Sequence, residues 1–173
     1  MTKDFKQVNT KEKILYKNLL LLSRNTLFYT KFDLEDSFQN RIHLIFIHTS
    51  FLFIKIKQDA EISPYKVFYQ KMFDFIFVKI EENMREIGYG DVNVNKNMKI
   101  LVKNFYNILL TCEKYGKFDS ESKKMFFLKY LKLKGVKKHS ISDHLIDYFN
   151  KYEAFCFDLS SDSVLSGELN FNY

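Results

Sequence analysis

The chain has 173 residues and a formal net charge of +6, and 46% of its residues are apolar while 28% are charged. This balance excludes an intrinsically disordered chain, and the length suits one hydrophobic core better than two domains. A single proline and five glycines argue against a turn-rich β-sandwich and leave room for long helices. Cys112 and Cys156 have no metal-binding spacing, so we expect two buried thiols in a reducing compartment.

Neither a targeting segment nor a membrane span is expected from the sequence. Residues Met1 to Lys6 lack both the apolar stretch of a signal peptide and the Arg- and Ser-rich composition of a transit segment. The most apolar run, Leu44 to Ile54, contains polar residues and is shorter than the roughly 20 residues that a membrane-spanning helix needs. We therefore expect a soluble protein that stays in the compartment where it is made.

Apolar residues recur every three or four positions from the beginning of the chain, which predicts amphipathic helices. A capping box that starts at Asn9 opens the first helix, which is expected to end near Arg24. The next segment, 25–36, has no clear period and is predicted to be irregular, with Phe28 and Tyr29 anchored in the core.

A second helix is predicted from about Asp36 to Lys57, and it is apolar on almost every side. Such a helix is usually central and buried. The polar residues that remain form a narrow line at spacings of seven, namely Arg41, His48 and Lys55. This line is either the one strip that faces solvent or a contact surface for a partner.

The third and fourth helices are predicted to be joined by a short glycine-containing loop. Ser63, followed by proline, is a strong helix start, and Gly88 can supply the left-handed residue that ends this third helix. The fourth helix is expected to begin at Asn93 or Asn95 and to stop at Gly116. Its inner stripe comprises Met98, Leu101, Val102, Phe105, Ile108, Leu109 and Cys112. Its opposite face carries Lys96, Lys99, Lys103 and Asn107.

A fifth helix, capped by Asp119 or Ser120, is expected to reach Lys134, and a sixth begins after a cap at Ser142. Residues 123–138 contain seven lysines and no acid. After residue 157 the chain has no clear period. The sequence therefore predicts an all-α protein, a single compact domain of about six helices over residues 9–157, with a short C-terminal tail over 158–173.

Motifs for catalysis and for metal or nucleotide binding are not found in the sequence. The histidines form two pairs, His43 with His48 and His139 with His144, and the members of each pair are five residues apart. Helical metal ligands usually stand three or four residues apart, so we expect no metal site, no cofactor, no small-molecule substrate and no enzymatic activity. A haem with His48 as an axial ligand is an open alternative to a core histidine.

The most informative segment, 84–92, reads Met-Arg-Glu-Ile-Gly-Tyr-Gly-Asp-Val and is followed by Val94, Lys96 and the pair 105–106, Phe-Tyr. It resembles the ubiquinol–cytochrome c chaperone family, whose members carry a similar run, a Val-x-Lys helix start and then Phe-Tyr.

The likeness extends to other parts of the chain. The pair 28–29 is similar to an early Phe-Tyr of the family, and Arg41, Leu44 and His48 match its Arg-x-x-Leu-x-x-x-His helix. Lys55 stands where a basic residue is typical, and residues 167–171 are similar to the family's terminal Gly-x-Leu-x-Phe. The resemblance covers about residues 13 to 116 and is faint beyond them.

The resemblance implies an all-helical, non-enzymatic assembly factor for the cytochrome bc1 complex that binds newly made cytochrome b or another subunit. It also implies partner-binding residues, which are Arg41, His48, Lys55, Arg85, Asp91, Lys96, Lys99, Lys103 and Tyr106. Gly88 and Gly90 are expected to shape the loop. For the charged residues the alternative is an ordinary solvated face, and for Gly88, Gly90 and Asp91 it is a role in capping and turning the helices.

Two further expectations concern partners and location. The lysines of 123–138 suit a ribosomal or an anionic membrane surface, and they make a basic nucleic-acid- or ribosome-binding module the main alternative function. That alternative is weakened because residues 120–138 contain no Asn, Gln or Arg to read bases. The expected location is the cytoplasm of a bacterium, at the inner face of its membrane, or the mitochondrial matrix in a eukaryote.

Overall fold

The computed structural model describes residues 10–58, 63–135 and 140–173, and within them the chain is helical apart from short connections. The predicted all-α fold is therefore confirmed. The elements in chain order are α1 (Lys11–Ser23), α2 (Leu27–Thr30), α3 (Phe38–Gln58), α4 (Ser63–Glu86), α5 (Asp91–Cys112), the 3-10 helix η1 (Tyr115–Lys117), α6 (Ser120–Tyr130), α7 (Asp143–Asp158) and α8 (Ser161–Ser166).

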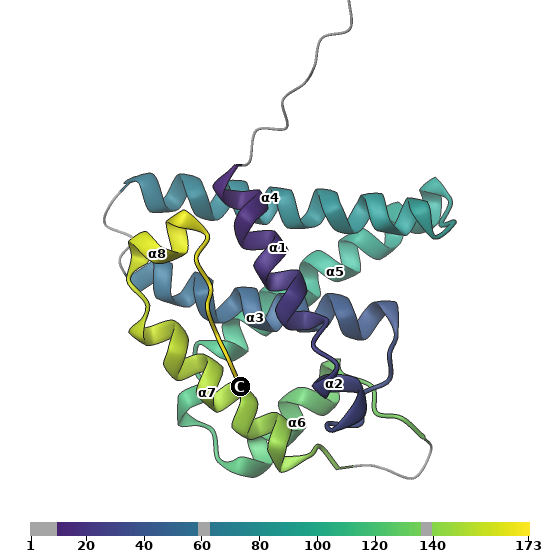
Figure 1. Cartoon of the computed structure of the whole chain (residues 1–173). Helices are drawn as coiled ribbons and strands as arrows, with labels where there is room; N and C mark the ends of the chain where they lie inside the picture. Colours follow the sequence, from purple (N-terminus) through teal and green to yellow (C-terminus); the bar gives the residue numbers. More distant parts are fainter. Residues whose placement is uncertain (1–9, 59–62, 136–139) are drawn as a thin grey trace, which may run out of the picture.

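Helix α3 is the central element of the fold. Every residue from Ile42 to Ile54 is buried, as expected for a helix that is apolar almost all round. The antiparallel pair α4 and α5 covers one side of α3, and α7 and α8 pack on its other side (Figure 1). Helix α1 crosses in front and contacts α3, α4 and α8.

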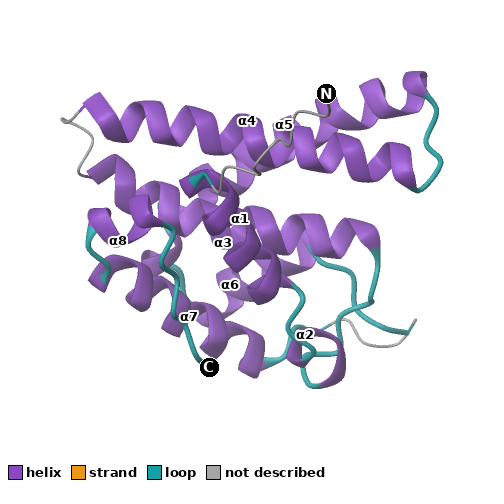
Figure 2. Ribbon diagram, turned by 45° about the horizontal axis from the view of Figure 1, so that its top comes forward, coloured by secondary structure: helices purple, strands orange, loops and turns teal. Residues whose placement is uncertain are grey.

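Helix α5 and helix α4 form a long hairpin whose connecting turn projects beyond the other helices (Figure 2). The two helices are held together by aromatic side chains. The ring of Phe105 on α5 lies 5.8 Å from that of Phe77 and 5.4 Å from that of Phe73, both on α4. Offset and edge-to-face ring pairs of this kind add to the burial of apolar area.

Local sequence signals set most of the helix ends. The side chain of Asp119 accepts from the backbone N–H of Ser122 at the start of α6, and Ser142 caps α7 in the same way. At the start of α1 the cap is Thr10, whose hydroxyl accepts from the N–H of Lys13. The predicted cap, Asn9, lies outside the described residues.

Three predicted boundaries differ from the structure. The segment predicted to be irregular contains the short helix α2, with Phe28 fully buried. Helix α5 begins at Asp91, earlier than Asn93 or Asn95, because Gly90 takes the extended cap conformation, and it ends at Cys112. Within the predicted fifth helix, α6 ends at Tyr130, well before Lys134.

Residues 131–134 leave the helix because they pair with a distant segment. The N–H of Glu35 donates to the carbonyl of Lys132 at 2.9 Å, and the N–H of Lys134 donates to the carbonyl of Asp33 at 2.8 Å. The buried side chain of Asn40 completes this junction by bonding both backbone groups of Lys132. Tertiary hydrogen bonds thus replace the helical ones.

The C-terminal segment is part of the domain, and the prediction that 158–173 form a tail is wrong. Its helix α8 contacts α1 and α3, and Val164 is fully buried. The carbonyl of Gly167 accepts from the side chain of Asn18 at 2.7 Å. Further on, the ring of Phe171 lies 5.1 Å from that of Tyr152. The segment has no amphipathic period because it is held by scattered contacts instead of one helical face.

Candidate functional site

The hairpin between α4 and α5 brings together most of the residues that were predicted to bind a partner. Arg85 lies in the last turn of α4 and Asp91 begins α5, and Lys96, Lys99, Lys103 and Tyr106 follow along α5. Arg41 lies on the neighbouring end of α3, whereas Lys55 is near the other end of that helix. The predicted set is therefore divided among several surfaces, with its centre on α5.

The turn of the hairpin is built on two glycines with different roles. Gly88 has φ +97°, and the N–H of Tyr89 donates back to the carbonyl of Met84 at 3.0 Å, which is a Schellman end for α4. Gly90 has φ −72° and ψ 160° and serves as the N-cap of α5. Gly88 thus ends α4 as the capping alternative predicts, whereas the cap of α5 is Gly90 and not Asp91, which is the first residue of that helix.

Arg85 links the two sides of this turn by ion pairs at the protein surface. Its guanidinium donates to the carboxylate of Asp91 and also to that of Glu81, with Nη2 lying 2.9 Å from Glu81 Oε1. The hydrogen bond to Asp91, and to a smaller extent the one to Glu81, raises the pKa of Arg85 above its ordinary value. Arg85 therefore joins the last turn of α4 to the start of α5 in an ion-paired cluster and is not a free cation.

Apolar side chains are exposed on this same projecting turn. Val92 is 82% exposed and Ile87 is 56% exposed, and the ring of Tyr89 lies between them in the sequence. Large apolar residues that gather on one exposed turn are uncommon on a monomer and often mark an interaction site. We call Ile87, Tyr89 and Val92 the hairpin tip.

Two grooves flank the hairpin tip, and Phe38 and Ile42 of α3 line both of them. One groove, of about 190 Å³, runs past Ile87 and contains Arg24 and Arg41. The other, of about 110 Å³, contains Tyr89 and Ile100. Arg41 is held by Asp36, whose Oδ1 lies 2.8 Å from its Nε. The structure thus brings Arg41 and the 85–91 turn to one end of the molecule.

Along the outer face of α5 runs a line of exposed residues, which we call the α5 stripe: Val92, Lys96, Lys99, Lys103, Tyr106 and Leu110. Ile100, which is 48% exposed, lies beside its lysines. The spacings of the stripe residues alternate between four and three, so they lie along one side of the helix. In the described part of the chain, none of the three lysines forms an ion pair. Helix α5 carries no acid after Asp91.

His48 is not on the surface, and the predicted polar strip is wrong at this position. The side chain is 0% exposed, and its ring nitrogens contact the carbonyl of Leu44 and the hydroxyl of Tyr148. Helical spacing places His48 in line with Arg41, but α7 covers α3 at this level. Lys55 is half-buried, so only Arg41 of the three is well exposed.

His43 is likewise a core residue. Its Nδ1 lies 2.6 Å from the carbonyl of Tyr130, and Asn104 lies near its other nitrogen. Burial lowers the pKa of His43. His144 is exposed and His139 lies outside the described residues. Cys112 and Cys156 are buried and free, as expected, and burial raises the pKa of both thiols.

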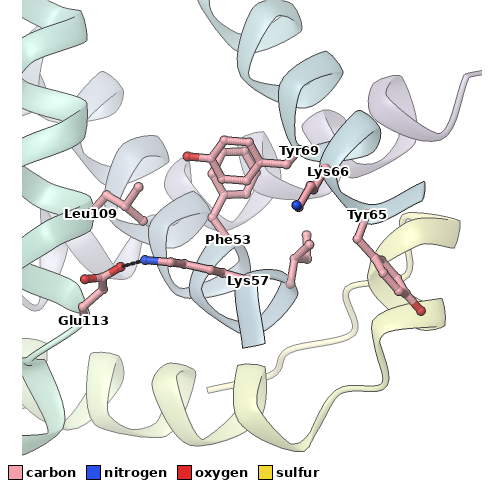
Figure 3. Close-up of a pocket in the computed structure, with 8 residues that line it drawn as sticks. Phe53, Lys57, Tyr65, Lys66, Tyr69, Leu109 and Glu113 are labelled. Carbon is pink, nitrogen blue, oxygen red and sulfur yellow. Dashed lines mark hydrogen bonds and ion pairs between the residues drawn. The ribbon is translucent and has the colours of Figure 1, made fainter. Parts of the chain in front are cut away.

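A separate pocket of about 290 Å³ lies at the far end of the hairpin, where α3 ends and α4 begins (Figure 3). Its wall is formed by the rings of Phe53 and Tyr69, whose centroids are 4.2 Å apart. Lys57 Nζ lies 2.7 Å from Glu113 Oε1 at its edge. This pair is exposed to solvent and adds little stability. The pocket contains none of the predicted residues.

The lysines of 123–138 do not form one continuous basic helix. Lys123 donates to Asn150, Lys124 lies 3.1 Å from Asp143, and Lys134 donates to the carbonyl of Tyr29. Lys137 and Lys138 lie outside the described residues. Several of these cations are therefore used within the fold.

Sequence reasoning did not identify the exposed apolar residues of the hairpin. Val92 and Leu110 stand at helical spacing with the lysines, on the face opposite the buried stripe. This spacing could have identified them, because an apolar side chain that shares a helix face with lysines is expected to be exposed and not to lie in the core.

Comparison with known proteins agrees with this fold. The family model described as ubiquinol-cytochrome C chaperone matches residues 30–171. The chain belongs to the ubiquinol–cytochrome c chaperone family. The crystal structure of the Cbp3 homolog from Brucella abortus is similar, with a TM-score of 0.77 and 19% identity, over 94% of this chain and 89% of that one. At this identity the likeness concerns the fold.

The match to the family extends well beyond the part of the chain in which the resemblance was recognised from sequence. It includes α6, α7 and α8, which the early motifs did not cover. No curated protein matches the chain. Within the described residues, no helix is both long and apolar enough to cross a membrane. Membership of this family supports a role as a chaperone in assembly of the cytochrome bc1 complex.

Proposed function

We propose that this protein is a non-enzymatic assembly chaperone that binds newly made cytochrome b beside the membrane into which it is inserted. The observation that carries the proposal is the family match over residues 30–171. The expected compartment is the cytoplasm of a bacterium, or the mitochondrial matrix in a eukaryote.

The hairpin tip and its two grooves supply a suitable contact surface for such a client. A membrane protein that is not yet assembled exposes apolar side chains, which bind best to apolar surface near a few fixed polar groups. Ile87 and Tyr89 provide apolar area, and each lines one groove. Arg24 provides a cation for client carboxylates or carbonyls at the edge of the first groove, where Arg41 is already bonded to Asp36.

A nucleic-acid-binding role is less well supported. Phosphate binding requires cations that are free to meet the backbone of the nucleic acid. Lys124 and Lys134 are engaged within the fold, and the segment after Tyr130 is extended. In the described part of 120–138, which reaches residue 135, the helix therefore ends at Tyr130 and does not carry the later lysines.

Affinity capture from the native cell, solubilised in mild detergent, tests the proposal. The wild-type protein is expected to retain cytochrome b, and Ile87→Asp is expected to lose most of it and to lower the yield of assembled bc1 complex. Val67→Asp is a matched control, because Val67 is 51% exposed at the other end of α4. Retention of ribosomal RNA without cytochrome b, or equal capture by both variants, would contradict the proposal.

A further inference from the structure

The α5 stripe has a composition that differs from the hairpin tip. Its three lysines stand in the middle, Val92 precedes them, and Tyr106 and Leu110 follow them. From Val92 to Leu110 the line extends for about 27 Å at 1.5 Å per residue. All six side chains point away from the buried side of α5, where Val94, Leu101, Phe105 and Ile108 pack.

The acids nearest this face bond to other groups and not to its lysines. Asp91 and Glu81, which flank it at the turn, are both bonded to Arg85. Asp74 on the adjacent α4 accepts from Gln70 at 2.9 Å. No described residue forms an ion pair with the stripe lysines. The stripe therefore presents three lysines that form no ion pair within the described residues.

We propose that the α5 stripe rests on the surface of a bilayer that contains anionic phospholipid. The lysines would meet the headgroups, and the apolar side chains at the two ends would enter the boundary between headgroups and acyl chains. Lysine suits this position because its long apolar stem reaches up to the headgroup level while the apolar neighbours sink below it.

The order of residues along the stripe favours a bilayer over a protein or a nucleic acid. Protein interfaces place apolar residues at the centre and charges at the rim. Along the α5 stripe itself the lysines are central, and the exposed Ile100 lies to one side of them. A nucleic acid would use the lysines on phosphates but would leave Val92 and Leu110 without a role. A flat anionic surface with an apolar layer beneath it uses all six side chains at once.

The inference extends the proposed function, because a chaperone for a membrane protein works beside a bilayer, but it does not depend on the identity of the client. Capture of cytochrome b in detergent tests the hairpin tip without any bilayer, and vesicle binding tests the α5 stripe without any client. Failure of either one is therefore distinguishable from failure of the other.

Co-sedimentation of the full chain with vesicles provides the test, with phosphatidylglycerol mixed into phosphatidylcholine in one set and phosphatidylcholine alone in the other. Each lysine near an anionic surface strengthens binding about fivefold. The triple change Lys96→Gln, Lys99→Gln and Lys103→Gln should thus weaken binding on the order of a hundredfold. The matched control removes the same charge from exposed lysines elsewhere, by Lys17→Gln, Lys31→Gln and Lys71→Gln.

A fluorescent probe reports the orientation on the bilayer. An environment-sensitive label on Val92→Cys should shift to shorter wavelength with anionic vesicles, whereas one on Leu21→Cys, at a residue 63% exposed on α1, should not. The two native cysteines are buried and will react slowly. The proposal would be overturned if both triple variants lost vesicle binding equally, or if the wild-type protein bound neutral vesicles as strongly as anionic ones. It would also be overturned if the change of the stripe lysines weakened binding to RNA or to a protein but not to vesicles.

Discussion

The Nε2 atom of His48 lies 2.9 Å from the hydroxyl oxygen of Tyr148, at the contact between α3 and α7. On the other side of the ring, Nδ1 lies 2.7 Å from the carbonyl oxygen of Leu44. A carbonyl oxygen only accepts, so Nδ1 carries a proton, and in the neutral ring the Tyr148 hydroxyl donates to Nε2. Burial disfavours the charged imidazolium, so the ring is neutral, and both of its nitrogens are used inside the core.

This neutral histidine makes stability depend on pH. Burial lowers the pKa of His48 to about 4, whereas in the unfolded chain it is about 6.5. As the pH falls, the unfolded chain takes up the proton first, so stability that is complete above pH ~6.5 is lost between there and pH ~4. We expect the free energy of unfolding to fall by about 2 kcal/mol from pH ~7 to pH ~5.

Urea denaturation at these two pH values measures the effect. His48→Gln should reduce the difference between them, whatever it does to stability at neutral pH. His144→Gln, which changes an exposed histidine, should leave the difference unchanged. A wild-type protein equally stable at both pH values would show that His48 is not held neutral.

The two glycines of the hairpin turn should respond in opposite ways to the same substitution. Gly88→Ser should destabilise the protein by about 1–2 kcal/mol, because φ is +97° there. Gly90→Ser should stabilise it by up to about 1 kcal/mol, because a serine at an N-cap accepts from the first turn of the helix. Thr10 and Ser160 do so with nearly the same backbone angles as Gly90. Chemical denaturation of both variants checks the pair, and a loss of stability in both would show that the turn tolerates no side chain at either position.

The ion-paired cluster of the turn allows Arg85 itself to be tested. If its role is to fasten the turn, Arg85→Ala and Asp91→Asn should lower the yield of assembled bc1 complex alike, and the double variant should be no worse than either. Lys99→Glu should also lower that yield. The thermal midpoint should change little in all of them, because these side chains are exposed.

A direct contact between Arg85 and the client gives a different pattern. Asp91→Asn would then leave assembly intact, because the guanidinium would be freed for the client while Arg85→Ala would still fail. Full assembly by all of these variants would identify the cluster as an ordinary solvated face and would move the search for the binding surface to the lysines of α6.

Gly167 tests whether the C-terminal segment belongs to the core. Its φ is +82°, and a Cβ at this position would lie 2.8 Å from Cγ2 of Ile14. Gly167→Ala should therefore cost about 2–4 kcal/mol, from both backbone strain and overpacking. Gly135→Ala is the control, since Gly135 also has a positive φ but no atom within 4 Å of its Cβ position, so it should cost only about 1–2 kcal/mol. Thermal or urea unfolding separates the two, and equal losses would mean that the packing against α1 is loose.

Some features of this protein were determined by the sequence alone because they are local. The 3.6-residue period identified each long helix, and the ends at Gly88, Asp119 and Ser142 follow from capping groups that lie within a few residues of the helix they cap. The family motif of residues 84–92 is local as well. Its Gly88 and Asp91 occupy the turn for which the residue types are suited.

Other features were decided only by tertiary contacts between distant parts of the chain. Periodicity shows that Arg41 and His48 share a stripe, but not that α7 covers the stripe at His48 and leaves Arg41 open. Residues 131–134 have a helical pattern in the sequence, but they are not helical because their backbone groups form hydrogen bonds with segment 33–35. In the sequence, Val164 and Phe171 have the pattern of a tail, but in the fold they pack against α1 and α7. Burial depends on which residues the fold places opposite a side chain, and the local sequence does not contain that information.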